Sequence, residues 1–442
     1  MTYFFETYGC QMNTAESAAL DLALKERGWQ AAQDGETADL VLLNTCSVRE
    51  TAEKRVLGRL AQYAALKKKR PFTLVVAGCM AQRLGEGLKE KAGAVDYVMG
   101  TSSRSVFPLI LEAVEQGRRE ILSEEKPVFA FSSSHLEEGQ FRSFVPIMHG
   151  CDNFCSYCIV PYVRGREISR DPVSIKEEIR LLAGRGVREI TLLGQNVNTY
   201  HWEGAGGPPD FPGLLELAAG ETAGTSIGWI RFLSANPKDF SPRTIEVMAG
   251  NPAFCRHLHL CVQHGSNRVL KAMNRRYTRE SYLDLAAEIR KAMPGVSLST
   301  DILVGFPGET EADLEETLSL MEEVKFLYAY MYHYNPREGT AAYGLPGRIP
   351  EDVKRERLGR VIALQKKHTR ELLKNRIGMR EKVLIEGISR KNADELITRT
   401  EKDEMVVVSG SPDLIGSFVH VTLSSLRGNT FRSKEISLCR GD

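Results

Sequence analysis

The sequence predicts an α/β protein with an N-terminal parallel α/β domain, a central partial (β/α)6 barrel and a C-terminal small antiparallel β-barrel. Three observations predict this order. Short apolar segments alternate with helix-length segments over the first hundred residues, the alternation resumes with a longer period over 144–334, and about sixty final residues hold short alternating strands separated by glycines. Strand and helix in alternation indicate parallel sheets, whereas short strands alone indicate a small barrel.

The N-terminal domain is expected over residues 1–121. Its candidate strands are "TYFFETY", "ADLVLLNT", "FTLVVAG" and "DYVMG", and the helix-like segments between them are 14–27, 50–66 and 81–92. Short apolar strands joined by helices form a parallel sheet that is covered on both faces. The segment 122–140, "LSEEKPVFAFSSSHLEEGQ", is polar, rich in serine and interrupted by proline, which is typical of a linker.

The central domain is expected over residues 141–376. Its six candidate strands are "FVPIMHG", "REITLLGQN", "GWIRFLS", "HLHLCVQ", "SLSTDILVG" and "LYAYMYHY", and a helix rich in Lys and Arg trails them at 351–376. Six strands in this alternation indicate an incomplete relative of the eight-stranded barrel. In such barrels the active site lies at the carboxyl ends of the strands.

The C-terminal domain is expected over residues 377–440. In "HVTLSSL", Val421 and Leu423 face one way while the residues between them are polar, as in a half-buried strand. Small β-barrels often bind oligonucleotides. The cations that could contact phosphates are Arg390, Lys391, Arg399, Arg427, Arg432 and Lys434. Acidic residues lie between them, so local charge alone does not decide whether this domain binds nucleic acid.

Composition restricts the partners and the cellular location that we expect for the protein. The 58 Lys and Arg against 57 Asp and Glu leave a net charge of +1, so no global field attracts the chain to nucleic acid or membrane. The N-terminus lacks the basic start and apolar run of a signal peptide, and no segment reaches about 18 uninterrupted apolar residues. Nine cysteines, an odd number in a long chain, favour reduced thiols over a disulfide framework. We therefore expect a cytoplasmic protein without membrane contact.

The stretch "PIMHGCDNFCSYCIVPYVRG" carries Cys151, Cys155 and Cys158 and no fourth cysteine. A tetrahedral zinc site would need a fourth ligand, for which His149 would have to bend back from its own strand. A four-iron cluster held by three thiolates would instead leave one iron open to a small bidentate ligand. Because the triplet follows the first barrel strand, where an active site is expected, we favour the iron–sulfur interpretation.

A second triplet of cysteines is dispersed over the N-terminal domain. Cys10, Cys46 and Cys79 each follow a predicted strand. If those strands are adjacent and parallel, their ends share one edge of the sheet and the three thiols converge, again with one corner open. The remaining cysteines, Cys255, Cys261 and Cys439, have no matching partners and are interpreted as structural or incidental. His257 and His259 are interpreted as packed or hydrogen-bonded residues rather than ligands.

Polar residues also follow the later barrel strands. The candidate cofactor-binding residues are Tyr157, Gly194, Gln195, Asn196, Ser234, Asn236, Gln263 and Gly305. Each taken singly is compatible with an ordinary turn or helix cap. Taken together, four polar loops at the same end of the barrel, around a candidate cluster motif, favour a cofactor-binding site.

The C-x3-C-x2-C spacing, with Tyr157 before its last cysteine, is similar to the signature of the radical S-adenosylmethionine superfamily. Together with "TYGCQMN", "NTCSVRE", "GCMAQR", "LLGQNVN" and "VQHGSNRVLKAMNRRYT", it makes the whole chain resemble the methylthiotransferases of that superfamily. The terminal barrel resembles a TRAM module, an RNA-binding domain. One departure is "HLCVQHGS", because the family more usually has proline at Cys261 and serine at His264.

The resemblance implies two [4Fe-4S] clusters, one on Cys151, Cys155 and Cys158 and an auxiliary one on Cys10, Cys46 and Cys79. In the family, S-adenosylmethionine binds the open iron of the first cluster and yields a radical that removes hydrogen, the auxiliary cluster supplies or carries sulfur, and a second S-adenosylmethionine supplies the methyl group. The implied substrate is C2 of N6-isopentenyladenosine-37 in the anticodon stem-loop of tRNA. The implied partners are an electron donor such as a flavodoxin-type protein and a system that supplies sulfur or clusters.

Two alternatives stay open at the level of sequence. The same chemistry acts elsewhere in the family on threonylcarbamoyl-adenosine in tRNA or on an aspartate of a ribosomal protein, although the basic "REKVLIEGISRK" favours tRNA. A protein of another class, a non-catalytic iron–sulfur RNA-binding sensor, would need no polar loops around the first cluster and would not cleave S-adenosylmethionine.

Overall fold

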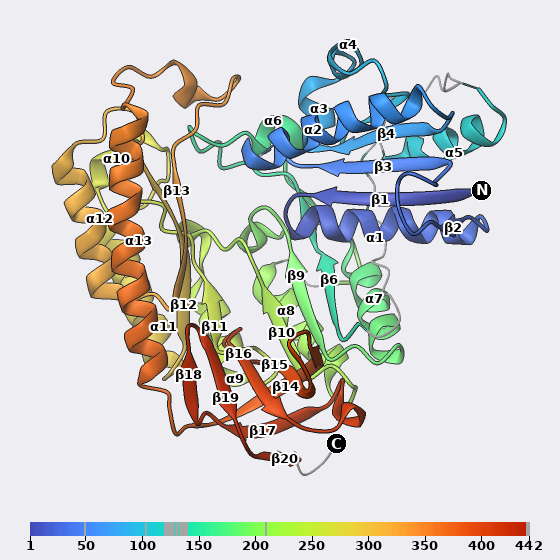
Figure 1. The fold of residues 1–442 in the computed structure, drawn as a ribbon. Coiled ribbons are helices and arrows are strands. Elements are labelled where there is room, and N and C mark those ends of the chain that lie inside the picture. Colours follow the sequence, from blue (N-terminus) through green and yellow to red (C-terminus); the bar gives the residue numbers. More distant parts are fainter. Residues whose placement is uncertain are drawn as a thin grey trace.

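The computed structural model describes residues 1–47, 50–101, 104–118, 129, 131, 140–207 and 210–438 (Figure 1). The predicted linker at 122–140 lies outside these residues except for 129, 131 and 140, and so does Cys439. Across the described part of the chain, every helix is too short or too polar to cross a membrane.

The N-terminal residues form a five-stranded parallel sheet in the order β2-β1-β3-β4-β5. The elements are β1 (Thr2–Tyr8), α1 (Gln11–Glu26), β2 (Gln30–Ala31), β3 (Leu40–Thr45), α2 (Glu50–Lys67), β4 (Thr73–Gly78), α3 (Cys79–Leu84), α4 (Gly87–Lys91), β5 (Tyr97–Met99), η1 (Arg104–Val106) and α5 (Phe107–Glu115). Along β3, Leu40 and Leu42 pack in one apolar core while Val41 and Leu43 pack in another. The parallel sheet with both faces covered is therefore confirmed.

One predicted helix of this domain is wrong in its extent. The segment 81–92 forms two short helices, α3 and α4, instead of one. The break falls at Gly85, whose φ of +52° lies in the left-handed region that glycine adopts at little cost. Helix α3 begins directly at Cys79, so this thiol sits at the junction of strand β4 and its helix.

The central residues form six parallel strands that follow one another in chain order. Strands β6 (Arg142–Pro146), β9 (Glu189–Leu193) and β10 (Trp229–Phe232) form one sheet, and β11 (His257–His259), β12 (Ser297–Val304) and β13 (Tyr328–His333) form a second. Parallel bridges from Ile230 to Phe254 and from Ala235 to Leu260 join the two sheets. The predicted partial (β/α)6 barrel is confirmed.

Helices cover the outside of this barrel (Figure 1). They are α7 (Pro172–Gly184), α8 (Phe211–Thr222), α9 (Pro242–Gly250), α10 (Asn267–Ala272), α11 (Arg279–Ala292), α12 (Glu311–Val324) and α13 (Glu351–Lys374), with the short 3-10 helices η2 (Val197–Thr199), η3 (Pro237–Asp239) and η4 (Ala341–Gly344). Helix α6 (Val160–Arg164) lies instead beside the N-terminal domain. The predicted strand "FVPIMHG" is divided between β6 and β7 (Met148–His149), and β7 pairs antiparallel with β8 (Ile168–Ser169). The first cysteine loop and helix α6 lie between these two short strands.

The C-terminal residues form a seven-stranded sheet in the order β18-β19-β16-β15-β14-β17-β20. Its elements are β14 (Arg380–Ser389), β15 (Asn392–Thr400), β16 (Met405–Ser409), η5 (Pro412–Leu414), β17 (Phe418–Thr422), β18 (Ser425–Arg427), β19 (Thr430–Ser433) and β20 (Ile436–Leu438). All ladders are antiparallel except the parallel pairing of β16 with β19. Val421 and Leu423 are buried as the alternation predicts.

The two outer units lie at opposite ends of the barrel (Figure 1). The N-terminal domain lies at the carboxyl ends of the barrel strands, where α1 contacts β6 and α3 contacts α6. The C-terminal sheet lies at the amino ends, where the ring of Phe418 packs 4.8 Å from that of Trp229 and Arg231 Nη1 donates to the carbonyl of Glu401 at 2.6 Å. The barrel interior is thus closed at its lower end by the C-terminal sheet and faces the N-terminal domain at its upper end.

Candidate functional site

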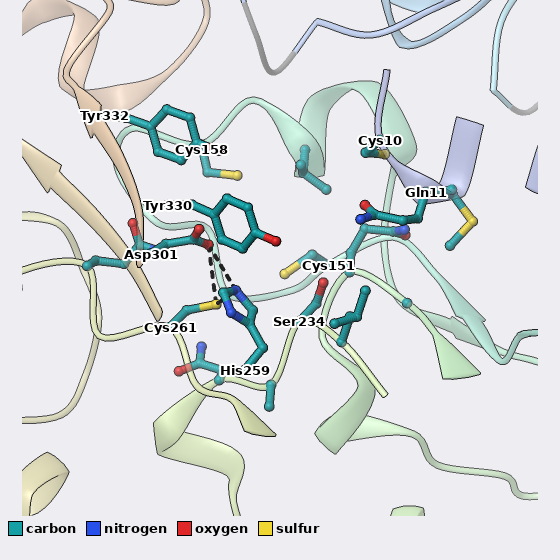
Figure 2. A pocket seen from close by; sticks show the side chains of 18 of the residues that line it. Cys10, Gln11, Cys151, Cys158, Ser234, His259, Cys261, Asp301, Tyr330 and Tyr332 are labelled. Carbon is teal, nitrogen blue, oxygen red and sulfur yellow. Dashed lines mark hydrogen bonds and ion pairs between the residues drawn. The ribbon is translucent and has the colours of Figure 1, made fainter. Parts of the chain in front are cut away.

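A cavity of about 1210 Å³ occupies the barrel interior and the space beneath the N-terminal domain. Its lining includes both cysteine triplets: Cys10, Cys46, Cys79, Cys151, Cys155 and Cys158. The N-terminal triplet converges because β1, β3 and β4 are neighbours in a parallel sheet, and one thiol follows each of these strands. Figure 2 shows Cys10 and Cys151 among the side chains that line this cavity.

The first triplet lies in the loop between β7 and α6. A tight turn brings its members together, since the N–H of Cys158 donates to the carbonyl of Cys155 at 2.9 Å. The loop starts at Gly150, whose φ is +80° and whose added Cβ would lie 2.0 Å from the carbonyl oxygen of Arg166. Gln195 accepts a 2.6 Å hydrogen bond from the Gly150 N–H, so a predicted site residue holds the start of the cysteine loop.

Burial favours the neutral form of Cys151 and Cys158 when no metal is bound. Burial raises the pKa of Cys151 to about 11 and that of Cys158 to about 12, and for Cys158 the neighbouring Cys155 adds to the effect. Burial also raises the pKa of Cys79, against which the nearby Arg164 guanidinium acts. Metal ligation requires thiolates, so assembly of a cluster at neutral pH releases protons from this site.

In neither cysteine triplet do all three sulfurs lie close enough together to hold a single zinc ion. Tetrahedral zinc with Zn–S bonds of about 2.3 Å would place its sulfurs about 3.8 Å apart. Within the described ranges, the only group of three potential ligands whose donor atoms all lie within 4.8 Å of one another contains neither cysteine triplet. His149, the alternative fourth zinc ligand, stacks on Phe129 at 3.7 Å and does not belong to the cavity lining. Two three-thiol sites with wider sulfurs suit larger inorganic cores.

Two buried arginines, which the sequence reasoning missed, lie against the triplets. Arg275 Nη1 donates to Cys155 Sγ at 3.3 Å, and its Nη2 donates to the carbonyl of Cys261 at 2.9 Å. Arg164 forms a 2.7 Å ion pair with Glu16 of helix α1, and both side chains are at most 5% exposed. A guanidinium beside each triplet compensates the negative charge that thiolate-bound clusters carry. In the sequence, Arg275 is the first of two adjacent arginines in "MNRRYT". The structure buries Arg275 and exposes Arg276.

Most of the predicted cofactor-binding residues line the cavity. They are Tyr157, Gly194, Gln195, Ser234, Asn236 and Gln263. Ser234 and Gln263 adopt φ angles of +66° and +67°, which cost free energy for residues with a side chain and often occur at functional sites. Both residues follow barrel strands, as the sequence indicated.

Asn196 and Gly305 do not belong to the cavity lining. Asn196 is buried, and its Nδ2 donates to Asp239 Oδ2 at 2.9 Å, so it joins two of the rim loops. Gly305 has a φ of +72°, and a Cβ there would lie 2.6 Å from the Lys354 side chain. Asn196 thus belongs to the loop that carries the lining residue Gln195, whereas Gly305 follows β12 and packs against Lys354 of α13.

A third group of potential ligands lies in the same cavity and was not predicted. His259, Cys261 and Asp301 bring one donor atom each within 4.8 Å of the others, and Figure 2 shows them facing one another. The interpretation of Cys261 as incidental therefore does not account for its surroundings. Cys255, in contrast, is buried in an apolar cluster with Trp229 and Phe418, as expected of a structural cysteine.

Exposed aromatic rings complete the lining. Tyr330 and Tyr332 alternate along β13, both belong to the cavity lining, and they are 52% and 39% exposed. Figure 2 shows both rings beside the cysteine loops. Exposed aromatic faces bind nucleobases by stacking, largely independently of base identity.

Comparison with known proteins follows the three structural units. Residues 2–100 match Uncharacterized protein family UPF0004, residues 145–321 match the Radical SAM superfamily, and residues 374–434 match the TRAM domain. Among solved structures, the chain resembles the radical S-adenosylmethionine methyltransferase TsrM from Kitasatospora setae, with a TM-score of 0.60 and 16% identity over 77% of each chain. At this identity the likeness concerns the fold alone.

Curated relatives are much more similar in sequence. The tRNA-2-methylthio-N(6)-dimethylallyladenosine synthase of Treponema denticola is 50% identical, with 98% of this chain and 99% of the relative covered. The enzyme of the same name from Treponema pallidum strain Nichols is 51% identical over 98% of each chain, and that from Bacteroides fragilis strain YCH46 is 43% identical over 98% and 95%. The chain belongs to the family of tRNA-2-methylthio-N(6)-dimethylallyladenosine synthases, within the radical S-adenosylmethionine superfamily.

Proposed function

We propose that this protein methylthiolates C2 of N6-isopentenyladenosine-37 in tRNA, with S-adenosylmethionine as radical source and methyl donor. The observation that carries the proposal is that both cysteine triplets line one cavity. Sulfur insertion needs a group that removes hydrogen and a group that delivers sulfur at the same carbon. Two metal sites in the lining of one chamber meet that requirement.

The chemistry explains why ordinary side chains do not suffice. The C2 hydrogen of an adenine is neither acidic enough for a general base nor placed for displacement by a nucleophile. A [4Fe-4S] cluster held by Cys151, Cys155 and Cys158 would, together with S-adenosylmethionine, supply the one-electron chemistry for hydrogen removal, and a second cluster held by Cys10, Cys46 and Cys79 would supply sulfur. The residues of the chain orient these groups and exclude water.

Several residues have defined tasks in this proposal. Gln195 fixes the start of the first cysteine loop through Gly150, and Arg275 donates a hydrogen bond to the Cys155 sulfur. The lining loops at Ser234 and Gln263 hold S-adenosylmethionine. Their strained backbone indicates that the surrounding fold holds them in place before the cofactor binds.

The tyrosines of β13 are suited to the target base. Base–aromatic stacking contributes about 1–3 kcal/mol per base, which compares with the few kcal/mol needed to unstack a base. Because Tyr330 and Tyr332 line the cavity and are exposed, they offer such a surface within the chamber that holds the cysteines.

The C-terminal sheet is proposed to hold the anticodon stem-loop. Of the cations that the sequence indicated, Arg390, Lys391, Arg427, Arg432 and Lys434 are exposed. Arg432 pairs with Glu395 at 2.7 Å, and Arg399 pairs with Glu386 and Asp403, so these two arginines are less available to phosphates than the sequence suggested. Because protein cations that neutralise phosphates release the counterions of the RNA, the affinity of such binding falls as the salt concentration rises.

Reductive cleavage of S-adenosylmethionine needs an electron delivered to the first cluster, and each product carries away a sulfur atom, so a reductant and a sulfur source must both reach the chain from outside. We propose a flavodoxin-type protein as electron donor and a sulfur or cluster supply system, in the cytoplasm, where tRNA is modified. These two requirements support both partners.

The test is nucleoside mass spectrometry on tRNA from a strain that lacks the gene. Accumulation of N6-isopentenyladenosine without its methylthio form is expected, and re-expression of the wild-type chain should restore the methylthio form. Loss of methylthiolated threonylcarbamoyl-adenosine would instead assign the other tRNA substrate. An unchanged tRNA profile would contradict the proposal and leave the ribosomal aspartate or the sensor role.

A further inference from the structure

The cluster of His259, Cys261 and Asp301 lies outside both cysteine triplets but within the same cavity. Cys261 Sγ lies 3.3 Å from His259 Nε2 and 3.3 Å from Asp301 Oδ2, and the last two atoms are 3.6 Å apart. The three donors therefore form a compact triangle of one sulfur, one nitrogen and one oxygen. None of the tasks proposed above uses it.

We propose that His259, Cys261 and Asp301 form a mononuclear site for a divalent cation of the zinc type, with a fourth coordination position open to the cavity. This inference goes beyond the methylthiolation described above and does not depend on it. It assigns a third metal site to the chain, distinct from the two cysteine triplets.

The size of the triangle matches such an ion. With bonds of about 2.3 Å to sulfur and about 2.0–2.2 Å to nitrogen and oxygen, tetrahedral angles place the ligand atoms about 3.4–3.6 Å apart. The three separations in the structure, 3.3, 3.3 and 3.6 Å, agree with these values to about 0.3 Å. A single ion could thus bind with only small movements of the side chains.

The ligand side chains are fixed by rigid elements and by a second layer of contacts. His259 ends β11, Asp301 lies within β12, and the two strands pair in parallel. The Nδ1 atom of His259 lies 3.0 Å from Ser299 Oγ, which directs Nε2 toward Cys261 and Asp301. Metal-bound histidines in proteins are oriented by the same kind of contact at the other ring nitrogen.

The charge and chemistry of the set indicate which ion it would take. A thiolate and a carboxylate balance a divalent cation, and a neutral imidazole adds a third ligand, so binding releases to solvent both the Cys261 thiol proton and the proton that Cys261 and Asp301 stabilise on His259. A mixed sulfur, nitrogen and oxygen set suits zinc rather than magnesium or calcium, which prefer oxygen alone. Three protein ligands with one position free are typical of zinc sites that bind a further small ligand.

The open position defines the class of that further ligand. Figure 2 shows the triad facing the space that also contains Cys151, Cys158 and Tyr330. Water or a soft anion, such as sulfide or a thiolate, would coordinate zinc there. The site therefore provides a place for a sulfur ligand within the chamber.

The test uses the anaerobic holoprotein with both clusters loaded, because free cluster thiols would also bind zinc. The protein is dialysed against chelator-buffered Zn²⁺, and zinc and iron are counted per chain by mass spectrometry. We expect about one zinc per chain without loss of iron. In Cys261→Ala and Asp301→Asn the affinity should fall by roughly a hundredfold, whereas the matched thiol control Cys255→Ala should retain it, since Cys255 lies in an apolar cluster.

X-ray absorption at the zinc edge of the wild-type chain provides a readout that does not depend on the folding of variants. One sulfur at about 2.3 Å with nitrogen or oxygen neighbours at about 2.0–2.2 Å is expected. Three sulfurs around zinc would mean that the ion had entered a cysteine triplet, and this result would overturn the proposal. Zinc binding that is equal in wild type and Cys261→Ala, or no zinc retained by wild type, would overturn it as well.

Discussion

The ion pair between Arg164 and Glu16 joins the N-terminal domain to the barrel, and its removal should loosen that junction. Arg164 ends α6, directly after the first cysteine loop, and Glu16 lies on α1, directly after Cys10. Both side chains are almost fully buried, so Arg164→Met would remove the guanidinium that forms a buried ion pair with the Glu16 carboxylate. Breaking a buried pair in this way costs about 3–5 kcal/mol, compared with about 0–1 kcal/mol for an exposed pair.

The expected effect is local and is therefore best measured by hydrogen exchange. A loss of about 3 kcal/mol corresponds to roughly a hundredfold increase in the exchange rate of the α1 amides. Arg243→Met is the matched control, because Arg243 forms a pair with Glu216 at 2.8 Å in which both side chains are about half exposed. In the double variant Arg164→Met with Glu16→Gln, much of the protection should return, since no buried charge is left alone.

Arg164→Met should also affect S-adenosylmethionine cleavage and formation of the methylthiolated product differently. The first cysteine triplet and its loop stay within the barrel, so S-adenosylmethionine cleavage should persist, while methylthiolated product should fall because the second triplet is no longer held at a fixed distance. Exchange in α1 that rises no more than in Arg243→Met would refute the reasoning. So would equal losses of cleavage and product.

Three further variants test individual groups. Cys46→Ala should lower iron per chain from about eight to about four and abolish sulfur insertion while S-adenosylmethionine cleavage continues; equal loss of both activities would contradict the division between clusters. Arg275→Gln removes the donor to the Cys155 sulfur, so redox titration should show a more negative cluster potential and slower cleavage, whereas the exposed Arg276→Gln should change neither. Tyr332→Ala should raise the KM for tRNA at least about fivefold through loss of stacking, and Tyr332→Phe should not; equal KM values would exclude a stacking role.

The sequence predicted the features that depend on local pattern and on the geometry of parallel sheets. Cys10, Cys46 and Cys79 were expected to converge because strand ends of adjacent parallel strands share an edge, and in the structure all three line one cavity. The six barrel strands and the buried face of Val421 and Leu423 follow equally from apolar alternation.

Features that depend on tertiary register were missed. Cys261 and Asp301 are 40 residues apart, and only the pairing of β11 with β12 brings them together. The Arg164 and Glu16 pair spans 148 residues and two domains. The division of "FVPIMHG" into β6 and β7 depends on pairing with β8, whose two residues carry no strand pattern of their own.

The attachment of the C-terminal sheet limits how this protein can be re-engineered. Arg231, inside the barrel, completes its hydrogen bonds with the carbonyls of Thr400 and Glu401, and Arg142 pairs with Glu386. Deleting residues 377–442, or exchanging them for a module of different specificity, would take these two hydrogen bonds from Arg231, which would keep its 3.1 Å ion pair with Glu189, and would let water enter the chamber from below. A chimaera that keeps Thr400, Glu401 and Glu386 should tolerate substitutions on the exposed face of the sheet and still exclude water from the barrel interior.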